Sequence, residues 1–155
     1  MTRHTLVMAS FLLETHVMGA GPTGCMVALA LAQQNQRVVL FDPQAFDALT
    51  SRSRAYAITH SSRRLMQSLG LWDELQTDLV AFEQLDLRDL AAGRQVLFVA
   101  EDLAKKNRGH RGIGWILDHR PLMTVLLRKL QQSALVQMHL GGEAAPIPGP
   151  HSLVI

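Results

Sequence analysis

The hydrophobic pattern of residues 14–42 predicts a strand, a glycine-rich turn, a helix and a second strand. Val17 and Met18 end an apolar stretch, and the sequence GAGPTG follows them directly. Residues 22–34 have helical composition, and residues 37–42, RVVLFD, form a β-branched run that is typical of a buried parallel strand. This order of elements is that of a β-α-β unit, in which a helix joins two parallel strands.

The first strand is the weakest part of this pattern. Glu14, Thr15 and His16 are polar at positions where a buried parallel strand is normally apolar. We therefore expect the first strand to be shortened or to lie at the edge of its sheet. In either position it would support the glycine turn less firmly.

The rest of the chain mixes helices and strands. Residues 61–69 predict a helix that a serine caps and Gly70 ends, and residues 71–75 predict a short second helix. Alternating apolar and polar residues on both sides of the sequence AAGR predict a hairpin over residues 82–100. Beyond a polar loop over residues 101–112, the pattern predicts a strand over 114–118, a helix over 120–132 and strands over 134–140 and 151–155, separated by a Pro/Gly-rich loop.

Composition narrows the class of protein. The 155 residues, 48% of them hydrophobic, suffice for one compact domain. The net charge is only +2, and basic residues cluster only over residues 105–111, so no nucleic-acid partner is expected. No apolar run approaches the roughly 18 residues of a membrane span, although peripheral contact with a membrane stays open.

Cysteine and histidine usage excludes several kinds of site. Cys25 is the only cysteine, so the chain forms no internal disulfide, no zinc site built from several thiolates and no iron–sulfur cluster. A reducing, cytoplasmic setting fits this usage. The seven histidines show no metal-ligand spacing with carboxylates, so no metal is expected.

The three glycines after the first strand match the dinucleotide-binding pattern G-x-G-x-x-G. In this pattern Gly19 makes the tight turn, Gly21 lets the backbone approach a pyrophosphate, and Gly24 allows close packing of helix on strand. Asp42 ends the second strand 23 residues beyond Gly19, near the ~20 expected of an acidic residue that binds the adenosine ribose. The motif alone could also be a merely structural turn, and it does not distinguish FAD from NAD. The carboxylate of Asp42 disfavours NADP at this position.

Three segments of the chain resemble a known family. They are GAGPTGCMVALALAQQNQRVVLFD, SRSRAYAITHSSRRLMQSLGLWDEL and GWILDHRPLMTVLLRKL. In this order they resemble motifs of the flavoprotein aromatic hydroxylases, which are FAD-dependent monooxygenases. They are most similar to the subgroup that hydroxylates polyprenylated phenols in ubiquinone biosynthesis. The resemblance runs from residue 17 to about residue 140 and implies a Rossmann-like FAD-binding α/β fold of the glutathione-reductase type, with an antiparallel substrate-side sheet.

The resemblance also implies roles for individual residues. Pro22 belongs to the glycine motif, Arg54 matches an arginine that lies along the FAD pyrophosphate and ribose, and Arg120 matches one near the ribityl and phosphate region. Asp118 and His119 stand where the subgroup often has Glu and Asn. A solvated loop or surface arginine is the alternative for both Arg54 and Arg120. No catalytic side chain is expected, because in this family the flavin carries out the oxygen chemistry.

Cys25, which follows the glycine motif at the start of the helix, has two readings. The positive end of the helix could lower the pKa of its thiol. The family, however, uses small residues for packing at this position. We expect Cys25 to have a packing role.

By resemblance, the parent protein inserts an oxygen atom into the aromatic ring of a polyprenylated phenol or quinol, with NADH or NADPH as a candidate electron donor. Two further family motifs, an Asp-Gly element after residues 151–155 and a later Gly-Asp element, do not occur. We therefore expect residues 1–155 to be an incomplete FAD-binding domain without its C-terminal remainder, inactive alone, in which residues 82–118 contribute strands to the substrate-side sheet. The alternative is a non-catalytic module that binds a nucleotide or a partner. An NAD-binding Rossmann domain is disfavoured by the hairpin.

Overall fold

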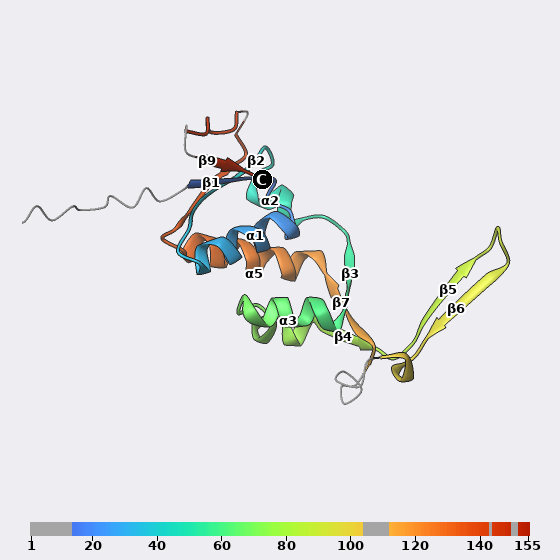
Figure 1. Cartoon of the computed structure of the whole chain (residues 1–155). Coiled ribbons are helices and arrows are strands. Elements are labelled where there is room, and N and C mark those ends of the chain that lie inside the picture. The colour runs from blue at the N-terminus through green and yellow to red at the C-terminus, as the bar shows by residue number, and fades with distance from the viewer. Residues whose placement is uncertain (1–13, 104–111, 143, 150–151) are drawn as a thin grey trace, which may run out of the picture.

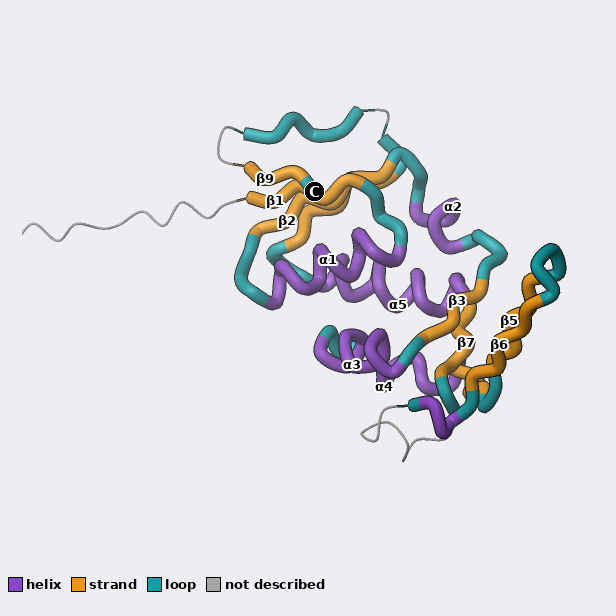
Figure 2. The backbone as a smooth tube through the Cα atoms, turned by 45° about the vertical axis from the view of Figure 1, so that its right-hand side comes forward, coloured by secondary structure: helices purple, strands orange, loops and turns teal. Residues whose placement is uncertain are grey.

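A computed structural model describes residues 14–103, 112–142, 144–149 and 152–155 (Figure 1). The basic cluster over residues 105–111 lies outside the described residues, as do parts of the loops expected over residues 101–112 and 141–150. The described part contains a parallel sheet, a layer of helices on it, a small antiparallel sheet and a projecting hairpin (Figures 1 and 2).

The parallel sheet contains four strands. In sheet order they are β8 (Val136–Leu140), β2 (Arg37–Asp42), β1 (Glu14–Met18) and β9 (Ser152–Val154). All three pairings are parallel. Together with α1 (Pro22–Gln33), which connects β1 to β2, they confirm the expected α/β fold with its β-α-β unit.

The expectation of a shortened or edge-like first strand is wrong. β1 spans five residues and pairs with β2 on one side and β9 on the other. Thr15 and His16 are 1% and 2% exposed. The Nε2–H of His16 donates to the Glu14 carboxylate at 2.9 Å, which partly compensates for burying the imidazole inside the sheet. β1 is therefore a central strand, and it holds the glycine turn between two neighbours.

Two helices cover one face of the parallel sheet. α1 and α5 (His119–Gln132) pack against each other and against β2 and β8 (Figure 2). Leu126, Leu127 and Leu130 of α5 are fully buried in the same apolar core as Val38 and Leu40 of β2. Among the described segments, no helix has the length and apolar character needed to cross a membrane.

A second layer follows the β-α-β unit. α3 (His60–Ser68) and α4 (Trp72–Leu75) confirm the two helices expected over residues 61–69 and 71–75. The antiparallel sheet has the order β3 (Ala55–Ile58), β7 (Gly114–Asp118) and β4 (Leu79–Phe82). The hydrophobic pattern had predicted β7 but neither β3 and β4 nor the short α2 (Phe46–Thr50).

The hairpin consists of β5 (Leu85–Asp89) and β6 (Arg94–Phe98), and it projects away from the helices (Figure 1). Within the described residues its two strands pair only with each other, while β7 pairs with β3 and β4. The hairpin and β7 thus lie in separate sheets, although both fall within residues 82–118. The assignment of these residues to one substrate-side sheet stays a prediction.

An ion-pair cluster joins α4 to α5. The Nζ of Lys129 lies 2.7 Å from a Glu74 carboxylate oxygen, and Arg128 contacts the other oxygen. The hydrogen bond from Lys129 is the main cause that lowers the pKa of Glu74 below its usual value, and the positive charges add to it. A carboxylate with a lowered pKa stabilises the fold above its unfolded-state pKa and loses this contribution as the pH falls.

We expect Glu74→Gln to lower the melting temperature slightly at pH 7 and by less at pH 3, because the ion pairs weaken as the carboxyl group takes up a proton. The effect is small because the cluster is exposed. Thermal unfolding followed by circular dichroism at both pH values tests this. Asp73→Asn, on the same short helix, serves as control. An equal decrease at both pH values would show that the ion pairs are not responsible.

Candidate functional site

The glycine turn after β1 is tied to the end of β2 by two hydrogen bonds. The backbone N–H of Gly19 donates to the carbonyl of Phe41 at 2.7 Å, and the N–H of Ala20 donates to the Asp42 carboxylate at 2.8 Å. Gly19 has a φ of +110°, which side chains other than that of glycine rarely tolerate. The turn therefore has one fixed shape at the carboxyl edge of the parallel sheet.

The three motif glycines meet different surroundings. A Cβ atom at Gly24 would lie 1.9 Å from the carbonyl oxygen of Gly19, so only glycine lets α1 approach the turn this closely. A Cβ atom at Gly21 would meet nothing within 4 Å, and its φ of −70° suits any residue. Gly24 is thus required for packing, whereas Gly21 borders open space at the start of α1.

The start of α1 offers uncapped backbone donors to this space. Gly21 is the N-cap residue without a side-chain cap, and Pro22 follows at the first helical position. Backbone N–H groups in the first turn of a helix have no intrahelical partner and carry a partial positive charge. We call the glycine turn and the start of α1, residues 19–24, the cradle. Its open space at Gly21 fits an anionic group such as a pyrophosphate.

Asp42 has a structural role that the sequence pattern did not predict. One carboxylate oxygen accepts from the N–H of Ala20 and the other from the N–H of Gln44, both at 2.8 Å. The residue is 8% exposed. Because each carboxylate oxygen has a second lone pair, these bonds leave acceptors for a ribose diol. Holding the turn and binding a ribose are compatible roles for Asp42.

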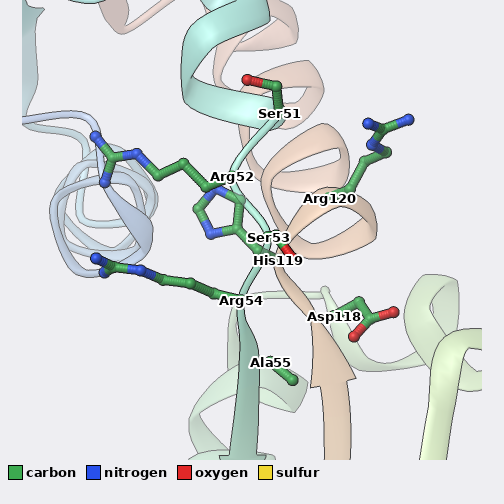
Figure 3. A pocket seen from close by; sticks show the side chains of 8 residues that line it. All are labelled: Ser51, Arg52, Ser53, Arg54, Ala55, Asp118, His119 and Arg120. Atoms are coloured by element: carbon green, nitrogen blue, oxygen red, sulfur yellow. The ribbon is translucent and has the colours of Figure 1, made fainter.

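Residues 51–54 form an arginine-bearing segment between α2 and β3. With the start of α5 this segment borders a pocket of about 410 Å³ (Figure 3). Its lining residues are Ser51, Arg52, Ser53, Arg54, Ala55, Asp118, His119 and Arg120. Arg54 also lines a second pocket, of about 420 Å³, together with Pro22 and Thr23 at the start of α1. Arg54 therefore connects the arginine segment with the glycine cradle.

The structure separates the two arginines that the resemblance had paired with FAD. Arg54 and Arg52 extend toward the side where α1 lies, whereas Arg120 extends the opposite way (Figure 3). All three side chains are exposed. The position of Arg54 suits a ligand in the cradle, while a contact between Arg120 and the same ligand stays a prediction.

Cys25 is a packing residue in this structure, as expected. Its side chain is fully buried and its thiol donates to the carbonyl of Ala20 at 3.2 Å. Burial, with a smaller contribution from the negative charge of Asp42, raises the pKa of the thiol to about 12. The thiol is therefore neutral at physiological pH and helps to hold the glycine turn.

Comparison with known proteins agrees with this arrangement. Residues 13–89 match the model of a family described as an FAD binding domain. The ubiquinone hydroxylase UbiM of Neisseria meningitidis is 39% identical over 62 residues, which cover 38% of this chain and 13% of UbiM. The uncharacterized protein slr1300 of Synechocystis is 22% identical over 119 residues, covering 77% of this chain and 28% of that protein. The chain thus spans less than a third of these curated relatives.

Solved structures share the fold. The p-nitrophenol 4-monooxygenase PnpA from Pseudomonas putida has a TM-score of 0.63 at 20% identity, covering 84% of this chain and 32% of PnpA. PqsL from Pseudomonas aeruginosa, a probable FAD-dependent monooxygenase, also has a TM-score of 0.63 at 20% identity, over 90% of this chain and 36% of PqsL. This chain has the fold of the FAD-dependent monooxygenases, and residues 13–89 match a family of FAD binding domains.

The match to a family of FAD binding domains makes FAD the cofactor to test against the cradle. The monooxygenase PieE, whose structure contains FAD and substrate, has a TM-score of 0.62 at 18% identity, covering 83% of this chain and 24% of PieE. The open space at Gly21, the free acceptors of Asp42 and the direction of Arg54 all fit a dinucleotide. No group of three or more side chains among the described residues could hold a metal ion.

We expect Gly24→Ala to lower the free energy of unfolding by about 1–3 kcal/mol, because its Cβ atom must displace the backbone of Gly19. Gly21→Ala should change the free energy by less than about 0.5 kcal/mol, because its Cβ atom meets no neighbour. Urea unfolding of both variants measures the difference. Equal stability of the two variants would contradict the assigned packing role of Gly24.

The raised pKa of Cys25 predicts low thiol reactivity in the folded chain. We expect alkylation by iodoacetamide at pH 8 to be at least about 100-fold slower in buffer than in denaturing urea, because burial disfavours the thiolate. Because the folded state favours the neutral thiol, the buried thiol contributes to the stability of the fold below its unfolded-state pKa. This contribution is lost as the pH rises toward 12, the pKa of the thiol in the folded chain. Mass spectrometry of timed samples measures the reaction. Fast alkylation of a folded sample would contradict the buried position.

Proposed function

We propose that this chain supplies the part of an FAD-dependent aromatic-ring monooxygenase that binds the adenosine and pyrophosphate portion of FAD. The observation that carries the proposal is the cradle. Its turn is fixed by Asp42, its helix start is uncapped, and the space at Gly21 is open toward Arg54. A merely structural turn would need Gly19 and Gly24 but would not need open space at Gly21.

Each residue of the cradle has a proposed task. The backbone N–H groups of the first turn of α1 would bind the pyrophosphate, and Asp42 would accept hydrogen bonds from the ribose hydroxyls. Arg54, which faces the start of α1 across the second pocket, would neutralise phosphate charge. Arg120 extends away from Arg54, so it would reach only a part of the cofactor that lies on that other side. When bound and reduced, the flavin supplies the oxygen-activating chemistry of this family.

The proposal extends to the substrate and the electron donor of the complete protein. The partial alignment with UbiM supports an aromatic ring of a polyprenylated phenol or quinol as the substrate of the complete protein. A reduced nicotinamide, NADH or NADPH, is the proposed electron donor, and it rests on the family resemblance alone. Contact with a membrane would follow from the lipid character of such a substrate. We propose that residues 1–155 bind FAD but hydroxylate no phenol by themselves.

A non-catalytic binding module is the second candidate, and one observation favours it. Leu85, Leu87, Val96 and Phe98 occupy one face of the β5–β6 hairpin, and all four are exposed. An apolar face of this kind is typical of a surface that contacts another protein segment. Oxidation of a phenol by the purified chain with FAD and NADH would exclude this candidate and would also contradict the proposed inactivity.

We expect the purified chain to quench FAD fluorescence saturably and Gly21→Val to weaken this binding by at least about tenfold. The reason is that the valine side chain fills the cradle without straining the backbone. Gly149→Val is the matched control, since it also adds a side chain at an unstrained, exposed glycine. Gly149 precedes β9, at the amino-terminal end of the strands, whereas the cradle lies at their carboxyl end. Equal affinity of both variants, or no binding by a chain that is folded, would refute the proposed site.

A further inference from the structure

His119 lies at the junction of β7 and α5, beside the arginine-bearing segment (Figure 3). It is the first residue of α5 and is 1% exposed. A buried imidazole is costly unless its nitrogen atoms have partners. Its two ring nitrogens and its backbone N–H contact this segment or the residues that flank it.

Three hydrogen bonds join His119 to residues 49–56. Its backbone N–H donates to the carbonyl of Arg54 at 2.8 Å. Its Nε2 lies 2.6 Å from the carbonyl oxygen of Leu49, and its Nδ1 lies 2.7 Å from the hydroxyl of Tyr56. Leu49 precedes the two arginines and Tyr56 follows them, so the two ring contacts bracket Arg52 and Arg54, and the third contact is to Arg54 itself.

The partners fix the tautomer of the ring. A carbonyl oxygen can only accept, so the Nε2 of His119 carries the proton and donates to Leu49. The Nδ1 of the neutral ring is then an acceptor, and the Tyr56 hydroxyl donates to it. The ring thus donates to one end of the segment and accepts from the other.

The arginine segment needs such an external support. Residues 51–54 belong to no helix or strand and are exposed. Neither an internal hydrogen-bond ladder nor burial therefore fixes the direction of the two guanidinium groups. The Nη of Arg52 donates to the side chain of Gln44, which orders only the end of that side chain. The N–H of Ser51 ties the start of the segment to Asp47 of α2. His119 ties both sides of the segment to the start of α5, through Leu49, Arg54 and Tyr56.

We propose that His119 is a positioning residue for cofactor binding. It holds residues 49–56 in the conformation that directs Arg54 toward the start of α1, where the phosphates of a dinucleotide would bind, and Arg52 to the same side. This role rests on the proposed FAD site. It assigns no contact between His119 and the cofactor.

The first test measures FAD affinity in a double-mutant cycle. We expect His119→Ala to weaken FAD binding about tenfold, and to have little further effect in a chain that already carries Arg52→Ala and Arg54→Ala. Tyr56→Phe, which removes one of the three bonds, should weaken binding by a smaller factor. His119→Gln retains a donor for Leu49 and should partly restore affinity. An equal loss in both backgrounds would overturn the proposal, because His119 would then act without the arginines.

The second test needs no cofactor and reports on the segment alone. We expect trypsin to cleave after Arg52 and Arg54 at least about fivefold faster in His119→Ala and faster in Tyr56→Phe. Cleavage after Lys129, inside α5, serves as the control for global unfolding. Unchanged cleavage after the two arginines, or an equal increase after Lys129, would overturn the inference. Absence of FAD binding by the unaltered chain would overturn the proposed function, and with it the role of His119 in cofactor binding, even if cleavage changed as expected.

Discussion

The close approach of Gly24 to the carbonyl of Gly19 sets the geometry of the whole N-terminal half. No other residue leaves room for α1 at this distance, because a Cβ atom would lie 1.9 Å from that oxygen. The approach brings the start of α1 to the carboxyl edge of the parallel sheet and exposes its free N–H groups there. Asp42 then fixes the turn from the side of β2. α1, positioned in this way, also packs against α5.

Much of this corner could be predicted from the sequence, because it depends on local rules. Glycine spacing, a helical segment and a β-branched run follow one another closely enough for the pattern to define the β-α-β unit. The polar residues Thr15 and His16 misled the prediction of β1. Strand pairing on both sides buries them, and the partner of β1 on one side, β9, comes from the far end of the chain. Sequence pattern carries no information on such a long-range pairing.

The arginine segment shows the same limit. A resemblance between motifs identified Arg54 and Arg120 but could not give the directions of their side chains, which Figure 3 shows to be opposite. Nor could it predict that His119 joins Leu49 to Tyr56, since these residues are separated by 70 and 63 positions from it. The motif predicted the glycine turn, whose shape depends on local chain geometry, while binding of a cofactor there stays a prediction. The prediction of the site was incomplete for the side chains, where tertiary contacts decide.

The central claim is that the backbone at the start of α1 binds the cofactor pyrophosphate. Titration of the ¹⁵N-labelled chain with FAD, followed by amide chemical shifts, tests it most directly. The account predicts that the N–H signals of Gly21, Thr23 and Gly24 shift together and saturate, and that those of the β5–β6 hairpin stay in place. Shifts confined to the hairpin, or none at all in a folded chain, would contradict it.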